Sequence, residues 1–264
     1  MIRVPILMYH SISDRPAAET APLAVRTGDF AEQLAYLSES GFTPMTASDL
    51  VAAFNKNQIP AKPVVVTFDD GYADFHSNAL PVLERLGFPA TVFLTSGWVA
   101  DAGKDAAGRP LDEMLSWTQA RECAQTGIEI GGHSHSHPQL DQLPDVELRA
   151  ELRKNKALLE EKIGAPVATM AYPYGYSSAR VRREVYKAGY FAGYAVNNAI
   201  AADKHDMLAI PRLTVARHTT LSMFKRAVEG NAVPLIYLRE RVLTKGYAVV
   251  RRTRYGMQRV MRNV

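Results

Sequence analysis

Short apolar runs alternate along the chain with longer amphipathic segments. The runs typical of buried strands are residues 2 to 9, 42 to 45, 63 to 69, 90 to 95, 127 to 132, 167 to 172, 190 to 196 and 208 to 215. The stretch 145 to 163 is a clear helix candidate, with Gly164 as its stop signal. Its apolar stripe consists of Leu148, Leu152, Leu159 and Ile163. This alternation predicts an α/β fold in which helices wrap a parallel sheet.

Eight strand-and-helix units indicate a single distorted (β/α) barrel of seven or eight strands, with an open doubly wound sheet as the alternative. The motif Asp69-Asp70-Gly71 follows the run 63 to 69, and no G-x-G-x-x-G phosphate loop is present. A length of 264 residues suits one barrel. We expect the barrel over residues 1–230, a surface loop over 100–116, and a C-terminal extension over 231–264.

Composition removes several classes of protein. The single cysteine, Cys123, excludes a disulfide framework and a multi-cysteine metal site, so that any metal must be held by His and carboxylates. The net charge of +4 gives no reason to expect a nucleic-acid partner, and no protein partner is indicated. The first apolar run is too short for a signal-peptide core, and no 18-residue apolar run occurs, so a cytoplasmic location is expected.

Three of the seven histidines lie within five positions, directly after the strand candidate 127 to 132. They are His133, His135 and His137, and imidazoles at this spacing can face one point from a strand or a helical turn. A polar loop rich in His and Ser is the alternative. The position of the cluster at a strand end favours a metal site.

A second polar cluster, Asp69-Asp70-Gly71, ends the apolar strand candidate 63 to 69. Two adjacent carboxylates in a partly buried cleft need a cation beside one of them, which leaves the other free to act as a base. An ordinary Asp-Asp-Gly turn is the alternative interpretation. A third segment, Tyr172-Pro173-Tyr174-Gly175-Tyr176, can wall a sugar cleft and present a backbone N–H to developing negative charge, or can be a packed aromatic turn.

Together these motifs resemble the polysaccharide deacetylases that share the NodB-homology domain, over roughly residues 2 to 220. The matching segments are Thr67-Phe68-Asp69-Asp70-Gly71, His133-Ser134-x-x-His137-Pro138 and Tyr172-Pro173-Tyr174-Gly175. The resemblance implies that Asp70, His133 and His137 are metal ligands and that Asp69 is the general base. It also implies that His135 points away from the metal.

The opening segment Pro5-Ile6-Leu7-Met8-Tyr9-His10 resembles the subgroup whose last strand motif has moved to the N-terminus, as in poly-N-acetylglucosamine deacetylases. This implies that His10 is the general acid. Familiar family members carry an arginine where this chain has Ala171, and that arginine orients the base. We expect Arg212 to supply the same charge from another strand, with a barrel-end salt bridge as the alternative.

The resemblance implies a hydrolase that removes an N-acetyl or N-formyl group from an amino sugar in a glycan or lipid-linked saccharide. Zn²⁺ is the first candidate for the metal, and Co²⁺, Ni²⁺ or Fe²⁺ suit the same ligands. The backbone N–H of Tyr174 would help to stabilise the oxyanion. The alternatives are a hydrolase of the same fold that cleaves a small non-sugar amide, and a carbohydrate-binding protein that has lost catalysis.

The C-terminal end is strongly basic. Residues 239–264 hold eight Lys or Arg and one acidic residue, so the last 26 residues carry about +7 and the preceding 238 about −3. At helical spacing the arginines fall on one side and the valines and methionines on the other. Residues 246–264 therefore indicate either a basic amphipathic helix on an anionic membrane surface or a terminal helix packed on the barrel.

Overall fold

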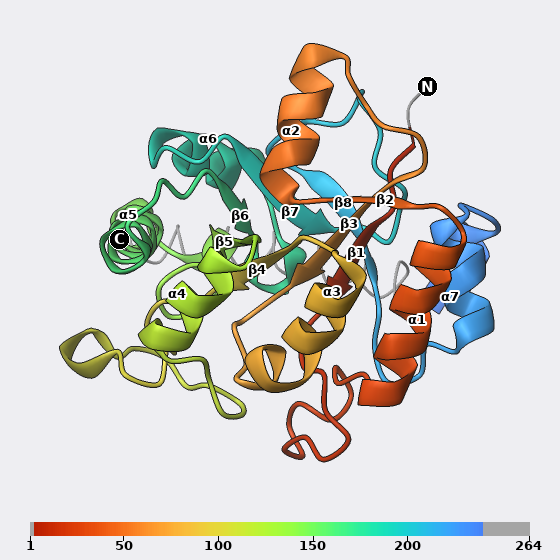
Figure 1. Cartoon of the computed structure of the whole chain (residues 1–264). Helices are drawn as coiled ribbons and strands as arrows, with labels where there is room; N and C mark the ends of the chain where they lie inside the picture. The colour runs from red at the N-terminus through yellow and green to blue at the C-terminus, as the bar shows by residue number, and fades with distance from the viewer. Residues whose placement is uncertain (1–2, 240–264) are drawn as a thin grey trace.

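Parallel strands close into a barrel at the centre of the molecule (Figure 1). The computed structural model describes residues 3–239. Its strands are β1 (Ile6–Tyr9), β2 (Thr43–Met45), β3 (Pro63–Phe68), β4 (Ala90–Leu94), β5 (Ile128–Gly132), β6 (Thr169–Ala171), β7 (Ala192–Val196) and β8 (Ile210–Thr214). The ring closes because β1 pairs with both β8 and β3, and β2 adds a strand beside the start of β3. The predicted single barrel of seven or eight strands is confirmed, and the open doubly wound alternative is wrong.

The barrel is distorted where β5 meets β6. These two strands share one residue pair, Gly132 with Met170, whereas β4 and β5 pair over five residues. Each of the eight apolar runs contains one observed strand, and most of these strands are one to three residues shorter at an end than the run. The difference arises because buried loop residues continue the apolar pattern beyond the last ladder hydrogen bond.

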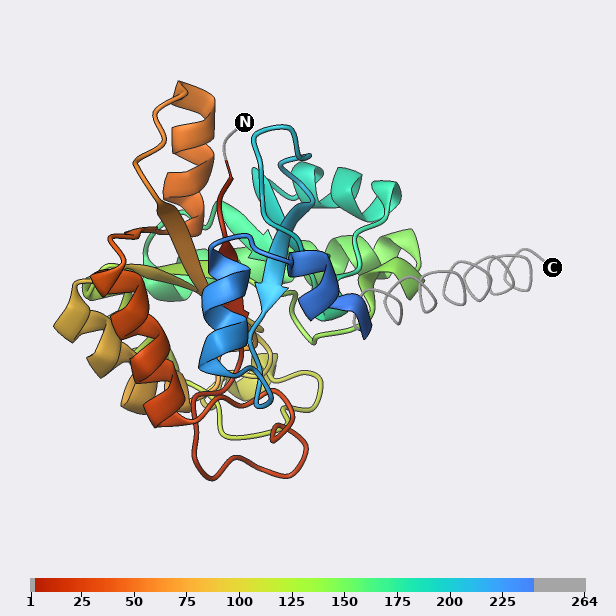
Figure 2. The ribbon, with the colours of Figure 1, turned by 90° about the vertical axis from the view of Figure 1, so that its right-hand side faces the viewer.

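The helices lie outside the strands, as two perpendicular views show (Figures 1 and 2). They are α1 (Thr27–Glu39), α2 (Ala47–Lys56), α3 (Leu80–Leu86), α4 (Trp117–Gln125), α5 (Asp145–Ile163), α6 (Ala179–Lys187), α7 (Leu221–Val228) and α8 (Val233–Ile236). Helix α5 has the predicted bounds, and Gly164 ends it in the left-handed conformation. Leu148 and Leu152 of its apolar stripe are buried.

Helix α2 covers the amino-terminal end of the barrel. The first helical residue, Ala47, donates its N–H to Thr91 at the start of β4, and its carbonyl accepts from the Tyr194 hydroxyl. The N–H and the hydroxyl of Ser48 both donate to Glu129 at the start of β5. Because all strands run in parallel, this contact leaves the carboxyl-terminal rim as the open end, where barrel enzymes place their sites.

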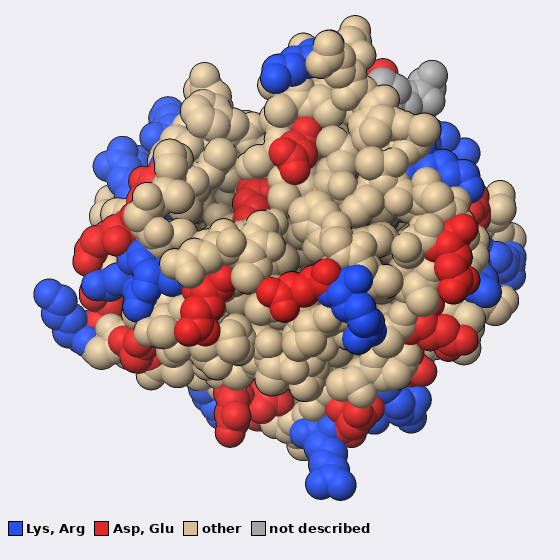
Figure 3. Space-filling view, in the orientation of Figure 1, with Lys and Arg blue, Asp and Glu red and all other residues tan. Residues whose placement is uncertain are grey.

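The described part of the predicted C-terminal extension packs on the barrel. Val233 and Tyr237 are buried, and the Tyr237 hydroxyl donates to the carbonyl of Thr214 at the end of β8. The basic segment 246–264 lies outside the described residues. Within residues 3–239, no helix has the length and apolar character needed to cross a membrane. Acidic and basic side chains are interspersed on the face shown in Figure 3.

Candidate active site

A cavity of about 490 Å³ opens among the loops that follow the strands at the carboxyl-terminal rim. Its polar lining includes His10 after β1, Asp69 and Asp70 after β3, and His133 and His137 after β5. The remaining lining residues are Met8, Leu23, Trp98, Arg109, Leu111, Ser136, Tyr172, Tyr174, Gly175 and Val196. The parallel barrel therefore brings together side chains that are far apart in the sequence.

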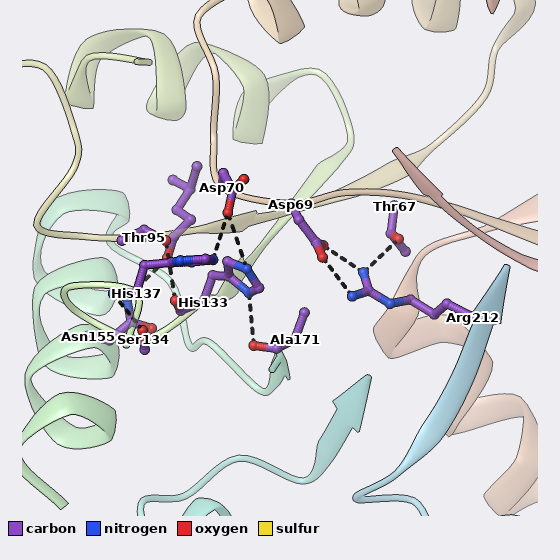
Figure 4. Close-up of polar contacts among 11 residues, drawn as sticks. Thr67, Asp69, Asp70, Thr95, His133, Ser134, His137, Asn155, Ala171 and Arg212 are labelled. Carbon is purple, nitrogen blue, oxygen red and sulfur yellow. Dashed lines mark hydrogen bonds and ion pairs between the residues drawn. The ribbon is translucent and has the colours of Figure 1, made fainter. Parts of the chain in front are cut away.

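Asp70, His133 and His137 form the group of potential metal ligands found in the described part of the chain. The Nε2 atoms of His133 and His137 lie 3.3 and 3.2 Å from Asp70 Oδ1 (Figure 4). Each of the three residues offers one potential ligand atom, and these three atoms all lie within 4.8 Å of one another. Two imidazoles and one carboxylate are a donor set for Zn²⁺ and for other divalent transition metals.

The hydrogen bonding of these residues fits a cation. His133 Nδ1 lies 2.9 Å from the Ala171 carbonyl, which can only accept, so the neutral ring points the lone pair of Nε2 toward Asp70. Asp70 Oδ1 is buried and accepts no hydrogen bond from residues 3–239. Lone pairs that converge without a proton between them repel one another unless a positive charge lies among them.

The electrostatics of the site favour positive charge as well. Burial raises the pKa of Asp70, but the imidazoles of His133 and His137 outweigh this effect and hold the pKa well below its usual value. Burial lowers the pKa of His133, but the carboxylates of Asp69 and Asp70 reverse this and raise it. A proton or a metal ion is thus attracted to the same place.

The loops that carry these ligands are conformationally unusual. Asp70, Ser134, His137 and Tyr174 have positive φ values of 72°, 62°, 62° and 59°, although none is glycine. Left-handed backbone at a residue with a Cβ costs about 1–3 kcal/mol and persists only where surrounding contacts enforce it. Such residues are typical of functional sites, and here all four lie at or beside the cavity.

Asp69 lies beside the ligand cluster and pairs with Arg212 instead (Figure 4). The Arg212 Nη1 and Nη2 atoms donate to Asp69 Oδ1 and Oδ2 at 2.6 and 2.7 Å, and the arginine is fully buried in β8. Arg212 Nη1 also donates to Thr67 Oγ1 at 3.1 Å. Burial raises the pKa of Asp69, but the Arg212 guanidinium, together with the imidazoles of His133 and His10, outweighs this effect and lowers the pKa below its usual value. The expected approach of Arg212 to Asp69 is therefore present.

His10 lines the same cavity from the end of β1. Its Nδ1 atom is buried and has no hydrogen-bond partner within the described residues. Burial lowers the pKa of His10, and the nearby carboxylates of Asp70 and Asp69 offset only part of this effect. The neutral imidazole therefore predominates near pH 7 before substrate binds.

Tyr174 borders the cavity on its exposed side, with 53% of its surface accessible. Its ring centroid lies 4.9 Å from that of His137 and 6.1 Å from that of Tyr176, to which it is stacked. His135 belongs to no ligand group in the described chain, and its Nδ1 lies 3.0 Å from Ser96 Oγ. Ala171 contributes its carbonyl to the His133 hydrogen bond while its side chain is buried.

Several lining residues were not identified from the sequence. The Trp98 ring lies 4.7 Å from that of His137, and Arg109 and Leu111 reach the cavity from the segment predicted only as a surface loop. Leu23 also lines the cavity, from the loop after β1. For Trp98, the one signal in the sequence is its position shortly after the end of the strand candidate 90 to 95.

Comparison with known proteins shows the family of the chain. The sequence model of the polysaccharide deacetylase family matches residues 56–193, which is more than half of the chain. The Bacillus subtilis (strain 168) protein YxkH is 28% identical over 229 residues, covering 86% of this chain and 77% of its own length. The poly-beta-1,6-N-acetyl-D-glucosamine N-deacetylase of Escherichia coli (strain K12) is 26% identical over 257 residues, covering 84% of this chain and only 38% of that enzyme.

Among solved structures, the Streptococcus pyogenes deacetylase PplD in complex with acetate superposes with a TM-score of 0.77 and 26% identity, covering 86% of this chain and 98% of that one. IcaB from Ammonifex degensii shares the fold, with a TM-score of 0.74 at 21% identity. The fold and the family match thus define a (β/α)-barrel enzyme, a carbohydrate N-deacetylase. The chain belongs to the polysaccharide deacetylase family.

Proposed function

We propose that the protein is a metal-dependent hydrolase that removes an N-acetyl group from an amino sugar in a glycan, releasing acetate and a free amine. The observation that carries the proposal is the pairing, in one cavity, of an Asp70–His133–His137 cluster with a separate carboxylate, Asp69. The E. coli relative is a poly-beta-1,6-N-acetyl-D-glucosamine N-deacetylase, which supports an N-acetylglucosamine polymer as the substrate class. An N-formyl group or a lipid-linked saccharide suits the same chemistry.

Asp70, His133 and His137 would hold the metal, with Zn²⁺ as the first candidate and Co²⁺, Ni²⁺ or Fe²⁺ as alternatives. When bound, such an ion supplies Lewis acidity toward the amide carbonyl and makes water more acidic. The hydrogen bond from His133 Nδ1 to Ala171 fixes the ring in the orientation that presents Nε2 to the ion.

Asp69 is suited to accept a proton from the attacking water. The lowered pKa keeps this carboxylate ionised, and the two-point contact with Arg212 fixes the direction of both oxygens. Holding a base in one orientation contributes to the rate because it removes the entropic cost of alignment. Arg212 thus acts through Asp69 and takes the role that the family resemblance would assign to an arginine at the position of Ala171.

His10 is suited to protonate the departing amine, because an amide nitrogen leaves poorly without a proton. Since its imidazole is neutral near pH 7, His10 must first take up a proton, and the proton that Asp69 removes from water is one source. Burial makes its imidazolium a stronger acid than usual, which favours transfer to an amine of higher pKa. Tyr174 would contribute its backbone N–H to the oxyanion and its exposed ring to a sugar face.

The test is removal and return of the metal with a substrate panel. Protein treated with a chelator should release no amine from N-acetylglucosamine oligomers, and added Zn²⁺ or Co²⁺ should restore release. A panel that includes N-formylated and lipid-linked glycans, polymers and small non-sugar amides then assigns the substrate class. Full activity of the metal-free protein, or hydrolysis of non-sugar amides alone, would overturn the proposal.

For the location of the substrate, we propose that the basic segment 246–264 binds an anionic membrane surface from the cytoplasmic side. The alternation of arginines with apolar residues in the sequence supports this proposal. Such contact would bring the barrel to lipid-linked glycans.

A further inference from the structure

The loop between the two metal-ligand histidines is held differently at its two ends. His133 is fixed by the sheet, since its N–H donates to the carbonyl of Leu94 on β4 and its Nδ1 donates a hydrogen bond to the carbonyl of Ala171 on β6. The N–H of His137 donates to Ser134 Oγ within the same loop, at 3.1 Å. The direction of the His137 ring therefore depends on how residues 134–136 are held.

These residues are enclosed from two sides. On one side, the carbonyl of His135 accepts from the N–H of Gly97, and Gly108 packs so closely that a Cβ there would lie 2.5 Å from the Ser136 carbonyl oxygen. On the other side lies Glu151, which projects from the middle of α5. One carboxylate oxygen of Glu151 accepts from the backbone N–H groups of His135 and Ser136 at 2.9 and 2.8 Å. The other accepts from Ser136 Oγ at 2.6 Å.

The Glu151 carboxylate thus receives three hydrogen bonds from two consecutive loop residues. Hydrogen bonds to a charged acceptor are roughly twice as strong as neutral ones. They act on a loop that keeps both Ser134 and His137 at a φ of 62°, a conformation that needs external contacts to persist. The aromatic rings of Trp98 and Tyr174 border the His137 ring. Ser96 also contacts the loop, through its N–H to the Ser134 carbonyl at 3.4 Å and through Oγ to His135 Nδ1 at 3.0 Å, but neither contact involves the N–H groups that donate to Glu151.

We propose that Glu151 is a positioning residue that holds His137 in the metal-binding geometry. The inference rests on the proposed function, because it assigns Glu151 to the metal site of that reaction. Loss of the carboxylate should release the strained loop and move His137, while His133 keeps its attachment to the sheet and Asp70, after β3, loses no contact. The site would then bind metal through two protein ligands in place of three.

The test measures Zn²⁺ affinity by competition with a chromogenic chelator in Glu151→Ala and Glu151→Gln. Outer contacts of this kind typically change metal affinity 10–100-fold, and we expect a loss of about this size for Glu151→Ala. Glu151→Gln should recover part of it, because the amide oxygen can still accept from the backbone and the amide nitrogen can donate to Ser136. Glu147→Ala, on an exposed residue of the same helix, is the matched control and should bind as the wild type does.

Hydrogen exchange of the metal-free proteins gives a second readout. Amides of residues 134–137 should exchange faster in Glu151→Ala than in the wild type and in Glu147→Ala, with α5 unchanged. Wild-type Zn²⁺ affinity or unchanged loop exchange in Glu151→Ala would overturn the inference. If Glu151→Ala fails to fold, Glu151→Asp serves: it keeps the charge but withdraws it by one methylene, and an undiminished affinity would contradict the proposal.

The two proposals fail separately. A wild-type protein that binds Zn²⁺ but releases no amine from any N-acylated glycan contradicts the proposed activity, while the affinity series on Glu151 still decides the positioning role.

Discussion

Arg212 and Asp69 form a buried two-point ion pair that joins the middle of β8 to the end of β3, across 143 positions of sequence. The arginine has no exposed surface and the aspartate is 3% exposed. Removal of one partner from such a pair costs about 3–5 kcal/mol, because the other charge stays buried without compensation. The stability of the barrel therefore depends on both partners being present, and the pair fixes the direction of the proposed base.

Replacement of Arg212 by Lys should separate these contributions. The lysine keeps a positive charge but cannot make the forked contact with both oxygens of Asp69. We expect kcat to fall by about 100-fold, as expected when a catalytic group is displaced by about 1 Å, with Zn²⁺ affinity unchanged. Wild-type kcat in Arg212→Lys would show that Arg212 only stabilises the barrel. Arg212→Ala, measured by denaturation, should lose about 3–5 kcal/mol of unfolding free energy.

Asn substitutions at the adjacent aspartates should have different effects. Asp69→Asn should keep Zn²⁺ and lose about 10²–10⁴-fold in kcat, the usual contribution of a general base. Asp70→Asn should lose both metal and activity, because Asp70 Oδ1 is the oxygen that faces both imidazoles. Metal content after dialysis and amine release in the same samples check both results. Full hydrolysis by Asp69→Asn would show that Asp69 is not the base.

A third prediction concerns the wall of the cavity. Asp112 Oδ2 accepts from the N–H of Ala17 at 2.8 Å and from Thr20 Oγ1 at 2.7 Å, so it ties the loop after β1 to the loop after β4. Leu23 and Leu111, which line the cavity, lie close to this tie in the sequence. We expect Asp112→Ala to raise KM for a glycan about 5–30-fold, from loss of about 1–2 kcal/mol of hydrogen bonding, with kcat within about twofold of the wild type.

The control for this variant is Asp203→Ala, at an exposed aspartate in another loop, which should leave both constants unchanged. A fall in kcat without a rise in KM would place Asp112 in the catalytic step and contradict its role in the wall.

The cysteine offers a check of the fold that is independent of activity. Cys123 is fully buried in α4, and burial, together with the nearby Glu122 charge, raises the pKa of its thiol to about 12. Because the thiolate is the reactive form, the native protein should not react with a thiol reagent at about pH 8, and denatured protein should react with one equivalent. Rapid reaction of the native protein would show that α4 does not pack as described.

The basic C-terminal segment predicts binding to anionic vesicles. The full chain should float with liposomes that contain phosphatidylglycerol and lose this binding at high salt, because each basic residue near the surface contributes about 1 kcal/mol. Protein without residues 246–264, and a full chain with Arg251, Arg252 and Arg254 changed to Gln, should remain unbound. Equal flotation of the full and shortened proteins would remove the membrane proposal.

The sequence was informative wherever the chemistry is local. Strands followed from apolar runs, and α5 followed from its stripe and its terminal glycine, because these patterns depend on neighbours in the chain. The ligand candidates could be named for the same reason. Asp70 follows one strand and His133 follows another, and parallel strands bring their carboxyl ends to one rim.

Contacts between segments that are far apart in the sequence could not be predicted from local patterns. Glu151 reads as one of several acidic residues on an amphipathic helix, and nothing in its neighbours shows that it accepts three hydrogen bonds from the histidine loop. Trp98 and Asp112 lie in loops whose paths depend on what they pack against. The sequence suggested Arg212 only because the position of Ala171 lacked the expected arginine.

The sequence by itself determined the alternation of strands and helices, the barrel class and the residue types able to hold a metal, because these follow from local periodicity and from side-chain chemistry. Only the tertiary structure decided that the ring closes through β1 and β3 and that Arg212 donates hydrogen bonds to both oxygens of Asp69. It also decided that Glu151 accepts hydrogen bonds from the loop that carries His137. The physical reason is that hydrogen bonds and two-point ion pairs form only between atoms about 3 Å apart, and only the closed barrel brings these atoms that near.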